Sequence, residues 1–171
     1  MRLSTVGHTG WADLEGAVYT TYNLFKFLHV AAVIVWVGGV IALTVIPARM
    51  ARQEGAAATA VLGRQAAFYG RSVVGPAAAI TLVAGIVMVV VGRLGFDELW
   101  IAYGFLGIVV SMGLGGGLLS RLGHQLAELS ESDAPDTTRI ASLQARLRTF
   151  NAINVLILLS VVWAMVFKPT L

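Results

Sequence analysis

Apolar residues along the chain gather into four long runs that polar segments separate. The runs cover about residues 22–46, 72–92, 99–119 and 150–167. Each is near the ~20 residues that a helix needs to cross the hydrocarbon core of a bilayer. The pattern therefore predicts an all-α, integral membrane four-helix bundle, formed as a single membrane domain over residues 1–171 and surrounded by lipid.

The segments between the runs predict further helices. Residues 56–71 fit a helix along the membrane interface, with the apolar residues toward lipid or protein and Arg64 and Arg71 toward headgroups. In the third loop, the stretch DTTRIASLQARL predicts a helix that leads into the last span, and Pro135 marks the break before it.

Composition supports a membrane protein and excludes several kinds of chemistry. Of the 171 residues, 57% are hydrophobic and 12% are charged, which is too apolar for a soluble domain of this length. Cysteine is absent, so disulfides, thiolate metal sites and thiol redox chemistry are excluded. No small-residue cleavage site follows a short hydrophobic core, and we expect the first span to act as its own insertion signal.

Charge predicts the orientation of the bundle. Two of the polar loops carry most of the basic residues, namely Arg49, Arg52, Arg64, Arg71, Arg121, Arg139, Arg146 and Arg148. The positive-inside rule puts these loops on the inner side and both termini outside, in a multi-pass protein of a bacterial-type cytoplasmic membrane. The net charge of +3 is explained by these loops, and we expect no nucleic-acid partner.

Small residues in two spans are spaced for close helix packing. Gly113 and Gly117 have GxxxG spacing in the third span, and Thr81 and Gly85 form a similar pair in the second. Such residues let helix backbones approach closely in lipid. Packing within the bundle is the favoured interpretation, and a homo-oligomer through the glycine-rich third span is the alternative.

One histidine, His29, interrupts the apolar residues of the first run, in the stretch KFLHVAAVIVWVGG. An imidazole in hydrocarbon is costly unless it is hydrogen-bonded, bound to a metal or turned toward the protein interior. Helical periodicity puts Tyr22 and Trp36 on the same face, each seven residues away. With an outer boundary near Tyr22, His29 lies roughly 10 Å deep. This face, in the outer half of the bilayer, is the candidate site.

Depth selects the groups of the other spans that share the level of His29. They are Met88, Tyr103 and Met165, and His8 can fold back from the segment before the first span. His124 belongs to the inner side, about a membrane thickness away. The outer-side cations are Lys26, Arg93 and Lys168.

An imidazole with a thioether, a phenol or a second imidazole nearby is what haem iron uses as ligands. We expect a haem b held by His29, with aromatic residues such as Trp36 along the macrocycle and Lys26 or another outer cation at the propionates. Met88, Met165, Tyr103 or His8 takes the sixth position, or it stays open. An open position suits a small gas ligand, and a filled one suits electron transfer with a quinone or a redox partner protein.

Two other interpretations use the same residues. His29 could hydrogen-bond a carbonyl or hydroxyl of a neighbouring helix and serve structure alone. It could instead bind copper transiently in a transport or metal-handling protein, with Asn151 and Asn154 lining a path. Two asparagines three residues apart are also typical of hydrogen bonds between spans, which is the favoured interpretation of this pair.

The first run resembles a known group of membrane proteins. In YNLFKFLHVAAVIVWVGGVIALTVIPARMA, the pattern Lys-x-x-His-x6-Trp-x-Gly/Ala-Gly is met by Lys26, His29, Trp36, Gly38 and Gly39. This resembles the first helix of the copper-resistance protein D family, the HemJ-type protoporphyrinogen oxidases and a related uncharacterised branch of small membrane proteins. The second run, with Pro76 and Gly85, and Trp100 at the start of the third also look like this group.

The resemblance to the HemJ-type enzymes implies haem b bound by His29 together with a lysine just after the third-helix tryptophan. That lysine is missing, because Ile101, Ala102, Tyr103 and Gly104 follow Trp100. The resemblance therefore supports haem binding, with a haem-dependent oxidoreductase as one form of it, more than porphyrinogen oxidation. Copper-resistance protein D implies copper passage, but the chain has no Met-x-x-Met or His-x-His cluster.

Overall fold

The computed structural model describes residues 9–50, 56–132, 134 and 136–169, and in these residues it contains helices and no strands. The helices in chain order are α1 (Thr9–Met50), α2 (Ala56–Tyr69), the π-helix η1 (Gly70–Val74), α3 (Gly75–Val91), α4 (Leu99–Gly113), the π-helix η2 (Leu114–Leu119), α5 (Ser120–Ser130) and α6 (Thr137–Phe167). The all-α prediction is confirmed.

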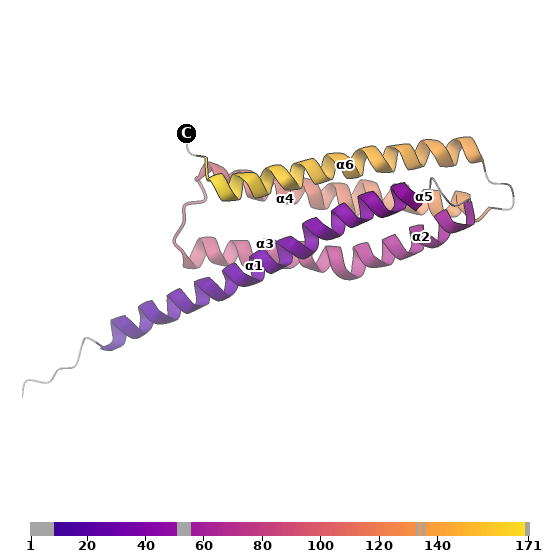
Figure 1. Cartoon of the computed structure of the whole chain (residues 1–171). Coiled ribbons are helices and arrows are strands. Elements are labelled where there is room, and N and C mark those ends of the chain that lie inside the picture. The colour runs from indigo at the N-terminus through magenta and orange to yellow at the C-terminus, as the bar shows by residue number, and fades with distance from the viewer. Residues whose placement is uncertain (1–8, 51–55, 133, 135, 170–171) are drawn as a thin grey trace, which may run out of the picture.

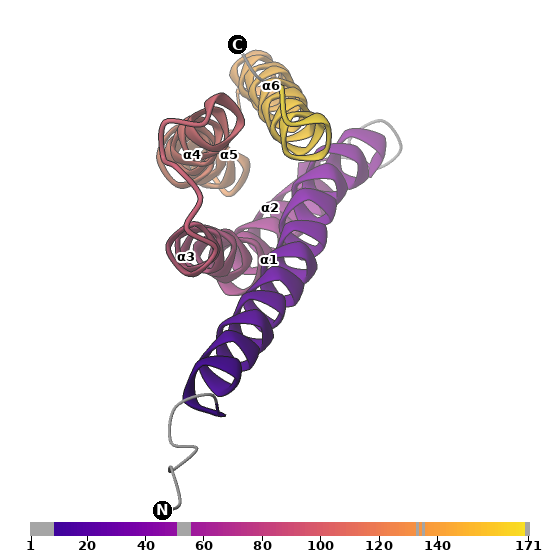
Figure 2. The same ribbon diagram turned by 90° about the vertical axis from the view of Figure 1, so that its left-hand side faces the viewer.

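These elements join into four long helices, which pack side by side as a bundle (Figure 1 and Figure 2). The segments long and apolar enough to cross a membrane are Leu14–Arg49, Gly63–Val91, Leu99–Ser130 and Thr137–Phe167. The first and last described turns lie at the same end of the bundle, as an even number of spans requires. We call this the outer end, and the inner end is the one where α1 leads into α2 and α5 into α6.

The helices are longer than the apolar runs because further residues extend them, α1 mainly at its outer end and the other three long helices at the inner end. The predicted helix over 56–71 forms as α2, but it continues the course of α3 through η1 rather than crossing the end of the bundle (Figure 1). The predicted helix before the last span also forms, as the first turns of α6. Its N-cap is Asp136, whose Oδ1 accepts a hydrogen bond of 3.0 Å from the backbone N–H of Arg139. Pro135 lies outside the described residues.

The centre of the bundle is packed around Trp36. Its side chain is 4% exposed and belongs to a core cluster with Val40 of α1, Ala77 and Ala78 of α3, Ile108 of α4 and Leu158 of α6. One indole therefore contacts a core to which all four long helices contribute.

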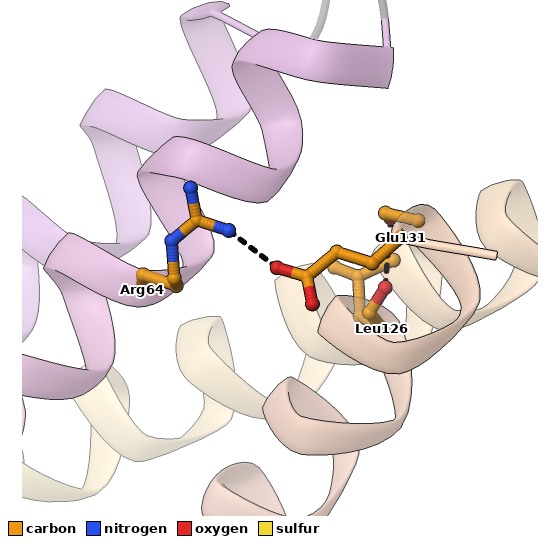
Figure 3. A network of polar contacts seen from close by, with 4 residues as sticks. Arg64, Leu126 and Glu131 are labelled. Carbon is orange, nitrogen blue, oxygen red and sulfur yellow. Dashed lines mark hydrogen bonds and ion pairs between the residues drawn. The ribbon is translucent and has the colours of Figure 1, made fainter.

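A second core lies toward the inner end, where α5 packs against the first turns of α6. Its buried members are Leu122, Leu126, Ile140 and Leu143. Nearby, the guanidinium of Arg64 on α2 pairs with the carboxylate of Glu131 just after α5 (Figure 3). Both side chains are more than half exposed, so the pair contributes little to stability. It does mark where the two inner helices meet.

Glycines allow the helices to approach each other at several points. A Cβ at Gly39 would lie 2.8 Å from Cγ2 of Val74, and one at Gly92 would lie 2.9 Å from Cε2 of Tyr22. Between α4 and α6, Gly104 faces Met165 and Gly107 faces Val161. The predicted close approach at Thr81 and Gly85 is confirmed between α1 and α3.

The prediction that Gly113 and Gly117 pack within the bundle is wrong. A Cβ at either position would meet no described atom within 4 Å. Gly113 ends α4 and Gly117 lies within η2, where this face of the helix is open. Their spacing is typical of close packing, but the helix is rotated so that both glycines face away from the neighbouring helices.

Gly39 and Gly38 provide a matched test of the contact between α1 and η1, where Val74 lies. Val74 is β-branched and has a restricted χ1, so it cannot easily move aside for a new methyl group. We expect Gly39→Ala to lower the free energy of unfolding by on the order of 1–3 kcal/mol. A Cβ at Gly38 meets nothing within 4 Å. We expect Gly38→Ala to be neutral or to raise stability by up to about 1 kcal/mol. Circular dichroism of the detergent-solubilised variants during denaturation measures both, and equal midpoints would contradict this packing.

Candidate functional site

His29 lies where α1 contacts α3. Its Nδ1 is 2.9 Å from the backbone carbonyl oxygen of Thr81, one turn before Gly85 on α3. A carbonyl oxygen can only accept, so Nδ1 carries the hydrogen and donates it. The neutral ring then keeps the lone pair of Nε2 free to accept a hydrogen bond or bind a metal.

The hydrogen bond depends on the small residues of α3. A Cβ at Gly85 would lie 3.3 Å from Cε1 and 3.4 Å from Nδ1 of His29, so the glycine lets the imidazole lie close to the α3 backbone. Thr81 is 2% exposed, and its hydroxyl donates to the carbonyl of Ala77 at 2.9 Å. The threonine hydroxyl is therefore satisfied, and its carbonyl holds the imidazole.

Of the candidate ligands that the structure describes, Met88 lies on the same helix face as these α3 residues. Gly85 contacts His29 and Gly92 contacts Tyr22, and Met88 lies between them at helical spacing. Its side chain is half-buried. Lys26 lies one turn outward from His29 on α1 and is exposed.

Met165 and Tyr103 have other partners. The Cε of Met165 lies against Gly104, in the contact between α6 and α4. The hydroxyl of Tyr103 is 2.8 Å from Oγ of Ser160, and the tyrosine is 42% exposed. Depth in the membrane was therefore a poor guide to these two residues, because both contact the α4–α6 pair.

Trp36, predicted on the face of His29, lies two turns farther along α1 in the central core. Among the outer cations, Lys168 has its Nζ 5.1 Å from the ring centroid of Trp100, a distance typical of a cation–π contact. His8 lies outside the described residues. His124 lies in α5, at the inner end of the bundle, as expected.

An apolar hollow of about 320 Å³ flanks the contact between α1 and α3. Phe25 and Leu28 line it from α1, and Ala79, Ile80, Val83 and Ala84 line it from α3. It is open along one side, where Leu28, Ile80 and Val83 are exposed. The hollow lies at the level of His29 and contains no charged side chain.

Sequence reasoning identified His29 but not its partner. A backbone carbonyl is present at every residue, so no side-chain pattern marks Thr81 as the acceptor. The spacing of Thr81 and Gly85 is the signal that could have found it, since it marks the stretch of α3 that another helix can approach. In the described residues, no group of three His, Asp or Glu side chains is arranged to hold a metal ion.

The tautomer of His29 can be tested directly. The chain has three histidines, so 15N labelling of histidine gives a simple spectrum, and His29→Gln identifies the signals of His29 by their loss. We expect a hydrogen-bonded N–H at Nδ1 and no hydrogen on Nε2, because the Thr81 carbonyl can only accept. A proton on Nε2 with none on Nδ1 would contradict the contact.

Comparison with known proteins identifies a family. The family described as "Predicted integral membrane protein (DUF2269)" matches residues 23–169. No curated protein and no solved structure matches the chain. These findings support a multi-pass membrane protein and give no support to a relationship with copper-resistance protein D or the HemJ-type enzymes. The match covers the first span from residue 23 onward and the other three spans in full, and the chain belongs to the DUF2269 family of predicted integral membrane proteins.

Proposed function

We propose that this protein binds a haem b in the outer half of the bilayer, with Nε2 of His29 as an axial ligand. The observation that carries the proposal is the hydrogen bond from Nδ1 of His29 to the carbonyl of Thr81. Histidines that bind metals almost always donate their other ring N–H to a carboxylate, a backbone carbonyl or water, which fixes the tautomer and the ring orientation. His29 meets this requirement without its Nε2 being used.

The surroundings of His29 also suit a flat apolar group. The hollow between α1 and α3 has an entirely uncharged lining and lies beside the histidine face. Lys26 is exposed one turn outward, where its ammonium could pair with a propionate at the membrane surface. Haem bound there would supply reversible one-electron chemistry or the binding of a small gas ligand.

The contacts of the candidate ligands favour Met88 for the sixth position. Met165 and Tyr103 contact α4 and α6 residues, whereas Met88 lies on the α3 face that contacts α1. A methionine opposite His29 would favour electron transfer, with a membrane quinone or a redox protein as the partner. An open sixth position would favour a gas ligand.

Copper handling is the second candidate function. His29 and Met88 offer an imidazole and a thioether on facing helices, and such ligands suit copper. The described residues provide no third His, Asp or Glu to complete a metal site there. Haem needs fewer protein ligands than a bare copper ion, and for this reason we favour haem.

The visible spectrum of the protein purified in detergent after expression with ample haem tests this function. We expect a Soret band, and in the pyridine haemochrome assay a b-type signal near one haem per chain. His29→Ala should remove the colour because it removes the axial nitrogen. His124→Ala is the matched control, since His124 is exposed on α5, and it should keep the colour.

Colourless wild-type protein would overturn the haem proposal. Copper measured at a fixed ratio in that protein, and lost in His29→Ala, would support metal handling. Neither haem nor copper would leave the bond to Thr81 as a purely structural contact.

Two methionine variants test the sixth ligand. Leucine conserves the volume of methionine but has no sulfur. We expect Met88→Leu to shift the absorption bands of the reduced haem and to lower its potential. Met165→Leu should leave both unchanged, because the thioether of Met165 lies against Gly104. A spectrum altered by Met165→Leu and not by Met88→Leu would reverse this assignment.

A further inference from the structure

Two buried polar groups in the inner half of the bundle have no hydrogen-bond partner among the described residues. They are Oγ of Ser111 on α4 and Oδ1 of Asn154 on α6. Ser111 is 2% exposed and Asn154 is 3% exposed. Buried polar groups in proteins are nearly always hydrogen-bonded, because an unpaired one loses its interaction with water and gains nothing.

The two side chains lie at the same level of the bundle. Ile108 and Leu158 share the core cluster of Trp36. Ser111 follows Ile108 by three residues and Asn154 precedes Leu158 by four. Because α4 and α6 are antiparallel, both steps lead one turn, about 5 Å, toward the inner end. The contacts of Gly107 with Val161 and Ile157 show that these faces of α4 and α6 are turned toward each other.

Ser111 differs from other hydroxyl residues of the spans. Thr44 donates to the carbonyl of Val40 at 2.7 Å, and Ser160 donates to that of Ile157 at 2.7 Å. This bond to the preceding turn is how a helical hydroxyl usually satisfies itself. Ser111 makes no such bond, and its hydroxyl therefore stays available for another partner.

The uncharged surroundings of the two oxygens favour a neutral hydrogen-bond partner. The buried polar residues in the described part of the chain are Thr81, Ser111 and Asn154, and none carries a charge. A cation would have no counter-charge in this apolar interior. Both oxygens accept hydrogen bonds, and water can donate one to each.

A route to the inner end follows the same face of α6. Asn151 lies one turn inward from Asn154 and is half-buried. We propose that Ser111 and Asn154 bind water within the bundle, and that this water enters from the inner end past Asn151. The core around Trp36 closes the route toward His29.

The absence of cysteine from the natural chain makes the route testable by labelling single cysteines. We would compare Ser111→Cys and Asn154→Cys with Ile108→Cys and Leu158→Cys, which lie one turn away in the core of Trp36. The probe is a small, membrane-impermeant methanethiosulfonate added to right-side-out or inverted membrane vesicles. We expect the first pair to react about tenfold faster than the controls or more, because buried thiols in a dry core are inert. The reaction should require the reagent on the inner side.

Equal rates for all four variants would overturn the route, and labelling only from the outer side would overturn its direction. The bound water is tested separately with Ser111→Ala in the full chain. If Oγ binds water, removing it should lower the midpoint of thermal unfolding in detergent. A raised midpoint would show that the hydroxyl is buried without a partner, and it would overturn the proposal.

Discussion

The close approach of α1 and α3 is the contact on which the outer half of the bundle depends. Lipid chains are as apolar as the helices, so helix association in a bilayer relies on van der Waals packing and on hydrogen bonds between spans. Gly85 and Gly92 of α3 lie where His29 and Tyr22 of α1 come against it, and Gly39 of α1 lies against Val74 of η1, just inward of Trp36. The hydrogen bond of His29 exists because Gly85 leaves room for the imidazole beside the α3 backbone. The packing of α1 against α3 and the position of the His29 imidazole therefore both depend on glycines, which have no side chain.

Much of the architecture could be predicted from the sequence because the bilayer restricts it. A spanning segment must satisfy its backbone groups internally, so runs of ~20 apolar residues become helices. The helix capped by Asp136 was predictable because its signals are local. The direction in which a residue points around the helix axis could not be predicted from the sequence. Gly113 and Gly117 were expected in a contact, but Gly104 and Gly107 make it. Likewise, depth suggested Met165 and Tyr103 as neighbours of His29, and their contacts are with other helices.

The core around Trp36 divides the interior into two different environments. On its outer side, the backbone carbonyl of Thr81 on α3 accepts a hydrogen bond from Nδ1 of His29. On its inner side, Oγ of Ser111 and Oδ1 of Asn154 have no hydrogen-bond partner in the part of the chain that the structure describes. Between the two environments lie the indole of Trp36 and apolar side chains that all four long helices contribute. The sequence indicated the first environment through one conspicuous histidine, whereas Ser111 is an ordinary residue whose burial depends on how α4 packs against α6.

The inner ends of the helices extend well beyond what a membrane needs. α6 has 31 residues, which is about 46 Å of helix against a hydrocarbon core of about 30 Å. Its first turns share a core with α5, and the Arg64–Glu131 pair joins the end of α5 to α2. A helix that crosses the bilayer surface without a break moves as one rigid body, so its embedded part and its protruding part move together. A tilt of α4 or α6 within the membrane must therefore also displace the arginine-bearing ends of α5 and α6 that lie beyond it.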